Sequence, residues 1–178
     1  MKKLSYLPLL LALTLPIVAC GDDGGGSGGE YDGLYELTVH QTKDDCSADT
    51  WADEVISEPY FYLEAQTMFS MDVIAWMDCT GTTIDTCSDS PDLSKSFARK
   101  DGLWQQHMTV SSYAGGECFL NYRRAVLEKT DTGISWEGIT KSGTVTVANE
   151  DECEPELAEQ REDELECSSM SYFEAERL

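Results

Sequence analysis

The pattern of apolar and polar positions along this chain predicts a series of β-strands. Alternation is clearest between residues 69 and 77, where the apolar side chains occupy every second position: Phe69, Met71, Val73, Ala75 and Met77. Other runs with a two-residue period, or rich in aromatic residues, predict seven further strands. These strands are expected over residues 34–40, 60–65, 95–99, 103–110, 118–128, 134–140 and 168–175.

Short and long connections alternate between these strands. Turn-forming sequences at residues 66–67, 100–102 and 129–133 predict tight hairpins. Eight strands joined in this way predict an all-β fold, namely an eight-stranded up-and-down antiparallel barrel, with a sandwich as the alternative. We expect one acidic helix over residues 155–166, and a short helix within residues 42–58 that covers one barrel end.

The first twenty residues follow a different pattern. Lys2 and Lys3 precede a mostly apolar segment that ends at Ala19, and its length of about 16 residues is short for a membrane-spanning helix. The sequence Ile17-Val18-Ala19-Cys20 then resembles the lipobox of bacterial lipoproteins. That resemblance implies cleavage before Cys20 and lipidation of its sulfur. Residues 1–19 are therefore expected to be a lipoprotein signal peptide, and an ordinary signal peptide is the alternative.

The resemblance also predicts where the protein is located and how it is divided. Residues 20–30 form a lipidated cysteine and a glycine-rich tether, and residues 31–178 form a disulfide-bonded β-domain. Two or three acyl chains on Cys20 would anchor the exported protein stably to a membrane. Gly21 stands where Gram-negative lipoproteins retained in the inner membrane tend to carry Asp. The resemblance therefore favours the outer membrane.

Cysteine usage supports this interpretation, because setting Cys20 aside leaves an even number. Three disulfides are expected in an oxidising compartment. The six candidates are Cys46, Cys79, Cys87, Cys118, Cys153 and Cys167.

The predicted topology narrows their pairing. Cys79 and Cys87 are close enough in sequence for a local bridge. The expected helix would hold Cys153 and Cys167 roughly 18 Å apart, too far for a disulfide. Closure of the barrel favours Cys46 with Cys167, which leaves Cys118 with Cys153. A regular meander places all of these disulfide-linked loops at one end, away from the tether.

Acidic residues dominate the charge of this chain. The formal net charge is −22, and it becomes −24 when Lys2 and Lys3 are removed with the signal peptide. Such a charge repels nucleic acids and anionic lipid headgroups, whereas cations or a basic protein partner would be attracted. The acids are expected to form a solvated surface. The alternative is a divalent-cation site at Asp85, Asp89 and Asp92, although this segment lacks the glycine and closing glutamate of a calcium loop.

Candidate catalytic chemistry is sparse. His40 and His107 lie far apart, opposite the apolar rows of their strands, and are expected to be exposed. No nucleophile–base pair, metal-binding spacing or phosphate-binding loop is evident, so we expect neither an enzyme nor a cofactor. Arg124 shares a strand face with Tyr122 and Val126, and either forms a salt bridge at the barrel rim or contacts an anionic ligand inside the barrel. Trp76, Trp104 and Trp136 are expected in the core.

These features predict a lipid-anchored envelope protein that is a non-enzymatic binding module. It would bind a small apolar or amphipathic ligand, or a protein partner, at its membrane-distal end. A structural envelope lipoprotein without a ligand is the alternative. The layout and the Gly33-Leu34-Tyr35 entry are loosely similar to lipocalin-like barrels. An open cavity of roughly several hundred Å³ would favour a ligand, and a filled core would favour a structural or partner-binding role.

Overall fold

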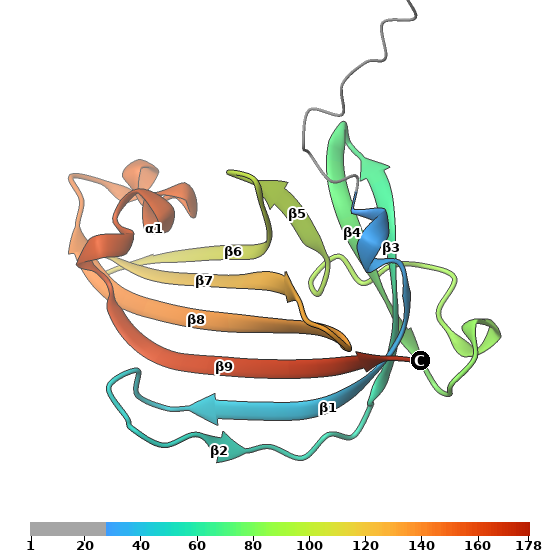
Figure 1. The fold of residues 1–178 in the computed structure, drawn as a ribbon. Coiled ribbons are helices and arrows are strands. Elements are labelled where there is room, and N and C mark those ends of the chain that lie inside the picture. Colours follow the sequence, from blue (N-terminus) through green and yellow to red (C-terminus); the bar gives the residue numbers. More distant parts are fainter. Residues whose placement is uncertain (1–27) are drawn as a thin grey trace, which may run out of the picture.

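The computed structural model describes residues 28–178, which form an antiparallel barrel with one short helix (Figure 1). The predicted signal peptide, Cys20 and most of the glycine-rich tether lie outside the described residues. The strands are β1 (Gly33–Lys43), β2 (Ala52–Asp53), β3 (Tyr60–Met68), β4 (Met71–Cys79), β5 (Phe97–Lys100), β6 (Leu103–Ala114), β7 (Glu117–Lys129), β8 (Gly133–Thr146) and β9 (Glu166–Arg177). Helix α1 spans Glu156–Gln160.

The strands follow one another around the barrel in chain order. The sheet order is β2-β1-β3-β4-β5-β6-β7-β8-β9, and an additional pairing of β1 with β9 closes an eight-stranded barrel to which β2 adds a short edge. All pairings are antiparallel, which confirms the predicted up-and-down barrel. No helix among residues 28–178 is long and apolar enough to cross a membrane.

The barrel is closed over only part of the length of its strands. β3 pairs with β1 only between Gly33 and Glu36, and β4 pairs with β5 only at Val73 and Ile74. β7, in contrast, pairs with β8 along its whole length. Figure 1 shows β3 and β4 standing across the long strands β6 to β9, which continue past them as a curved sheet. The barrel therefore has an open side where the long strands continue.

Two apolar clusters lie on opposite faces of the long strands. The larger fills the barrel and contains Trp76, Trp104 and Trp136, which confirms the expectation that these tryptophans are core residues. Tyr31 belongs to this cluster, and its ring centroid lies 6.4 Å from that of Trp104, so the chain entering β1 contributes to one end of the barrel core. The smaller cluster lies outside the barrel and joins β7 and β8 to the α1 segment through residues that include Ala158.

The predicted helices are only partly present. The acidic segment 155–166 forms the five-residue α1 followed by a 3-10 turn over Glu162–Glu164. The helix predicted within residues 42–58 is wrong, because that segment contains the short strand β2 and no helix among its described residues. Its few apolar residues are too sparse for a helical stripe.

The β3–β4 hairpin differs from the prediction in the position of its turn and in which side chains of β4 face the barrel interior. β3 continues through residues 66–67, and the chain reverses at Phe69 and Ser70. The interior cluster contains Ile74 and Trp76, which lie between the members of the alternating apolar row over residues 69–77 and do not belong to it. Val73 is also buried, so both faces of β4 are covered and the apolar period does not identify the inner face.

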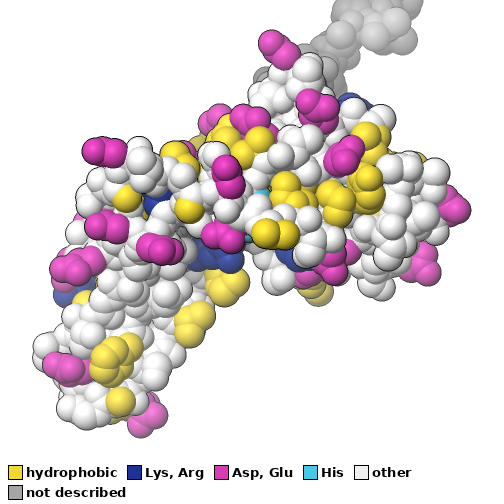
Figure 2. Space-filling model, turned by 90° about the horizontal axis from the view of Figure 1, so that it is seen from below, with side chains coloured by type: hydrophobic (Ala, Val, Ile, Leu, Met, Phe, Trp, Pro, Cys, Tyr) yellow, Lys and Arg dark blue, Asp and Glu magenta, His cyan; other side chains and the backbone are white. Residues whose placement is uncertain are grey.

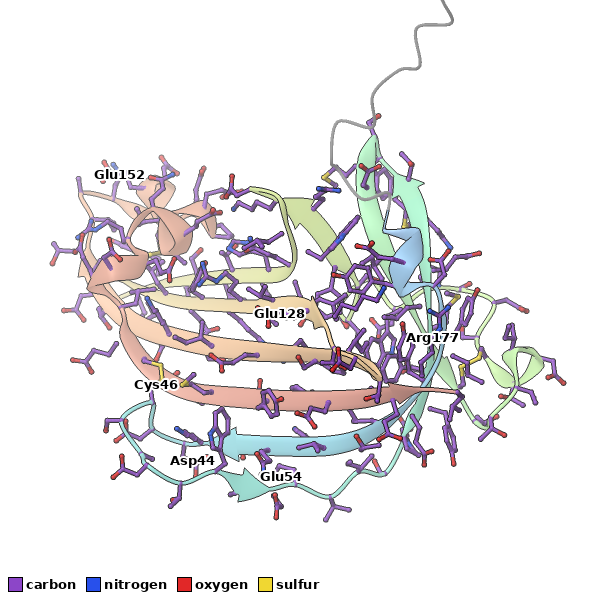
Figure 3. The ribbon with its side chains drawn as sticks, in the orientation of Figure 1. Asp44, Cys46, Glu54, Glu128, Glu152 and Arg177 are labelled. Atoms are coloured by element: carbon purple, nitrogen blue, oxygen red, sulfur yellow. A yellow bond between two sulfur atoms is a disulfide. The ribbon has the colours of Figure 1, made fainter. Side chains whose placement is uncertain are left out.

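The disulfides are Cys46–Cys167, Cys79–Cys87 and Cys118–Cys153, which confirms the pairing inferred from the topology. Their predicted gathering at one end is wrong. Cys46 lies at the far end of the long strands, whereas Arg177 lies at the opposite end (Figure 3). Residues 82–85, from the loop that carries the Cys79–Cys87 disulfide, line a hollow together with Arg177 and Gly33. The short, crossed β4 therefore places the third disulfide near the start of β1.

Candidate ligand-binding site

A cavity of about 430 Å³ opens where the long strands leave the barrel. Its apolar wall is formed by Trp76 and Phe97 from one side of the barrel and by Trp136 and Phe173 from the other. The loops before β3 and before β5 contribute residues 55–58 and 94–95 to its rim. The site is thus built from both the crossed strands and the long strands.

The aromatic rings of this wall form one continuous series. Phe61 stacks on Trp76, with ring centroids 3.7 Å apart, and Trp76 meets Trp136 edge to face at 5.6 Å. Trp136 stacks on Phe173 at 4.7 Å, and Phe173 stacks on His40 at 4.3 Å. Rings held in this way by their neighbours have little freedom to move. They offer a preformed surface on which a flat apolar group can pack.

His40 reaches the cavity because of an irregularity in β1. The register with β9 shifts between Leu37 and Val39, which inserts one extra residue at Thr38. A β-bulge of this kind changes the face on which the following side chains lie. His40 therefore lies on the same side as Leu37 and lines the cavity, so its predicted exposure on the opposite face is wrong. The bulge has no glycine or other local signal in the sequence.

Of the two adjacent arginines of β7, Arg123 lines the cavity and Arg124 does not. Arg123 pairs with Met108 across β6 and β7, and both side chains line the cavity. Arg124 pairs with His107 and lines a separate groove on the outer side of the barrel with Val126. Of the two alternatives for Arg124, the ligand contact inside the barrel is wrong, because Arg124 lies on the outer face of β7. The α1 segment covers part of that face, so apolar residues occur there as well.

The two cations that line the cavity have different surroundings. Lys95 Nζ lies 2.8 Å from Asp78 Oδ1 and 3.7 Å from Asp92 Oδ2, so its charge is balanced within the protein. Asp78 also accepts a hydrogen bond of 2.8 Å from Trp76 Nε1. Arg123, in contrast, has no hydrogen bond or ion pair with any other residue in the described part of the chain. Its guanidinium donors are therefore available to an acidic group in the cavity.

The predicted cation site is not formed. Within residues 28–178, no three His, Cys, Asp or Glu side chains are arranged to hold a metal ion, so Asp85, Asp89 and Asp92 are not brought together as ligands. Asp92 instead accepts hydrogen bonds from the Ser94 hydroxyl and backbone N–H, and these lower the pKa of its carboxyl. Figure 2 shows acidic side chains spread over one face of the molecule, as expected for a solvated surface.

A second polar cluster lies beneath the α1 segment, on the outer face of β6 and β7. Lys141 Nζ lies 2.9 Å from Glu162 Oε1, which fastens the segment to β8. Burial, followed by the charge of Glu162, raises the pKa of Tyr122 to about 12. His107 Nε2 is buried, has no hydrogen-bond partner in the described chain, and lies 3.8 Å from Glu159 Oε2. His107 is thus partly buried rather than exposed, and this cluster holds the segment in place.

Comparison of this chain with models of known protein families, with curated proteins and with solved structures finds no match.

Proposed function

We propose that this protein is a lipid-anchored, non-enzymatic binding module of the cell envelope. Its ligand is a small amphipathic molecule that enters the aromatic cavity. The observation that carries this proposal is Arg123, a cation without a protein partner in the described chain, at the wall of an aromatic cavity of about 430 Å³. A purely structural lipoprotein would not need such an opening, and pockets of roughly 300–1,000 Å³ suit small molecules.

The lining of the cavity defines the chemical class of the ligand. Trp136 and Phe173 offer stacked rings to a flat, apolar body, and Arg123 offers charge-assisted hydrogen bonds to a carboxylate, sulfate or phosphate group. The net charge of −22 repels anions before they arrive. A single acidic group on a largely apolar molecule is therefore favoured over a highly charged anion.

The anchor and its location belong to the same proposal. The lipobox-like sequence that ends at Cys20 supports lipidation, and Gly21 supports the outer membrane. Three disulfides are consistent with export to an oxidising compartment. In this arrangement the lipid holds the protein at the membrane, while the cavity collects an amphipathic molecule from the surrounding space.

Mass spectrometry of the natively purified protein tests this proposal. Under non-denaturing conditions, the expected result is an adduct of a few hundred daltons that denaturation releases. The protein with Arg123→Gln is expected to carry less of the same adduct. The proposal fails if the wild-type protein carries no adduct and its tryptophan emission is unchanged by a fluorescent aromatic sulfonate. That result would favour the structural role.

A further inference from the structure

The tip of the β3–β4 hairpin presents apolar side chains to solvent. Phe69 is 84% exposed and Met71 is 53% exposed. Residues 66–71 contain no charged side chain, in a chain with 34 acidic residues. Single exposed apolar residues are common, but Phe69 and Met71 lie together at a projecting tip, and the nearest following acid is Asp72 at its base.

The backbone of this tip is also unfavourable for its sequence. Phe69 has a φ of 52° and Ser70 a φ of 66°, both in the left-handed region. Two-residue turns with this geometry strongly favour Asn-Gly, because bulky side chains are strained there. The phenyl ring gains no compensating burial. A costly residue that contributes little to the fold indicates a role in contact with something outside the protein.

The tip lies beside the point where the described chain begins. β3 pairs with β1 only as far as Leu63, so its remaining residues project beyond the start of β1 (Figure 1). Gly28 lies against Ala65, to whose methyl carbon a Cβ on Gly28 would be 3.3 Å away. Ala65 is four residues from Phe69, a distance of about 13 Å along a strand. The chain thus enters the barrel beside the base of this projecting tip.

The proposed lipidation restricts how far this tip can lie from the bilayer. Cys20 precedes Gly28 by eight residues, and eight residues span at most about 28 Å even when fully extended. An anchored protein therefore keeps the hairpin tip within roughly 41 Å of the membrane surface, so the tip can reach the bilayer. A weak affinity of the tip for lipid is then sufficient, because the tether supplies a high local concentration.

We propose that the β3–β4 tip inserts Phe69 and Met71 into the interfacial region of the membrane that holds the lipid anchor. This inference rests on the proposed anchoring. A protein partner fits the tip less well, since a stable interface buries about 800 Å² on each side and two side chains provide far less. A second copy of this chain is also disfavoured, because each copy is strongly acidic, with a net charge of −22 for the full sequence and −24 without the predicted signal peptide. The membrane contact would fix the orientation of the barrel and hold its cavity at a defined height.

Depth-dependent quenching in reconstituted vesicles tests the insertion. The lipidated mature protein is placed in zwitterionic phosphatidylcholine vesicles, with or without brominated acyl chains. Phe69→Trp provides the reporter, and Val55→Trp provides a matched control at the cavity rim, where Val55 is 90% exposed. After subtraction of wild-type emission, the signal of the Phe69→Trp reporter is expected to fall about twofold with brominated lipid, and that of the Val55→Trp control to remain unchanged. Equal reporter signals with and without bromine would overturn the inference.

A second pair of variants separates membrane contact from folding. Met71→Trp is compared with the same reporter in a Phe69→Asn/Ser70→Gly background, which supplies the favoured turn sequence. The thermal midpoint should rise by about 3 °C in that background, while quenching of the Met71→Trp reporter by brominated lipid should decrease. Unchanged quenching would contradict the role of Phe69.

Vesicle flotation distinguishes the two proposals. If the wild-type protein does not float with vesicles, or if Cys20→Ser floats equally well, the proposed anchoring fails and the inference fails with it. If the wild-type protein floats and Cys20→Ser does not, but the Phe69→Trp reporter is not quenched, only the inference fails.

Discussion

Replacing Arg123 by glutamine removes the cavity cation that has no ion partner in the described chain, and it leaves Lys95 and the aromatic wall in place. Arg123 has no ion pair or hydrogen bond within the described chain, so its replacement should cost the fold little. Arg124→Gln is a matched control, because Arg124 is the next residue on the same strand and lines the outer groove. The two variants have the same net charge, and they alter opposite sides of the barrel.

The size of the expected effect follows from the environment of Arg123. A hydrogen bond to a charged group contributes about 1.5–3 kcal/mol, and the lower value applies because this side chain remains partly exposed. A loss of about 1.5 kcal/mol corresponds to a roughly tenfold larger dissociation constant for an acidic ligand. Arg124→Gln alters local charge interactions on the outer face, with Glu162 for example, but it reaches the cavity only through the long-range field. Salt screens that field, so an effect below about twofold is expected.

Two fluorescent probes that differ in one acidic group provide the assay. Anilinonaphthalene sulfonate carries a sulfonate, whereas phenylnaphthylamine has a similar aromatic body without one. Each probe is titrated into the wild-type protein and both variants, and quenching of tryptophan emission reports binding near Trp136. Arg123→Gln should weaken binding of the sulfonate about tenfold and leave binding of the neutral probe within about twofold.

Three outcomes would refute this reasoning. If Arg124→Gln weakens sulfonate binding as much as Arg123→Gln, the effect is one of overall charge. If Arg123→Gln weakens both probes equally, Arg123 maintains the shape of the cavity instead of pairing with an acid. If the thermal midpoint of Arg123→Gln falls by more than a few degrees, the residue has a structural role.

Further predictions concern stability. Burial lowers the pKa of His107, so the unfolded chain binds a proton more readily than the folded chain. The free energy of unfolding should therefore decrease as pH falls below about 6.5. His107→Gln should reduce this loss when urea midpoints are compared at pH 7.5 and 5.5. Gly133→Ala places a Cβ 2.0 Å from a backbone oxygen of β9 and should cost about 3 kcal/mol in urea unfolding, whereas Gly115→Ala, with open space around it, should cost about 1 kcal/mol for its positive φ. The double variant Cys118→Ala/Cys153→Ala removes a disulfide with a sequence separation of 35. Because this disulfide restricts the entropy of the unfolded chain, its loss should lower the free energy of unfolding by about 4 kcal/mol in guanidinium titrations. A loss below about 1 kcal/mol would contradict this entropic origin.

The sequence by itself determined the order of the eight barrel strands and the pairing of the cysteines, although it did not indicate the short edge strand β2. Strand period and turn chemistry are local properties, so eight alternating segments with intervening turns were sufficient to predict a closed meander. Asp101 and Gly102 illustrate this, since both adopt the positive φ values that their turn requires. The disulfides followed from that order, because chain order in a meander specifies which loops are neighbours.

Only the tertiary structure decided which face of each strand is the interior. In a strand that is covered on one side, the alternation of apolar and polar residues identifies the inner face. β4 and β7 are covered on both sides, so apolar residues occur on both faces and the alternation favours neither. Arg123 therefore lines the cavity, whereas Arg124, the arginine that the sequence offered as a candidate ligand contact, lies on the outer face. A single extra residue at Thr38 likewise moved His40 to the inner face. These outcomes depend on segments distant in sequence, the α1 segment over β7 and the register of β9 against β1, so local periodicity does not contain them.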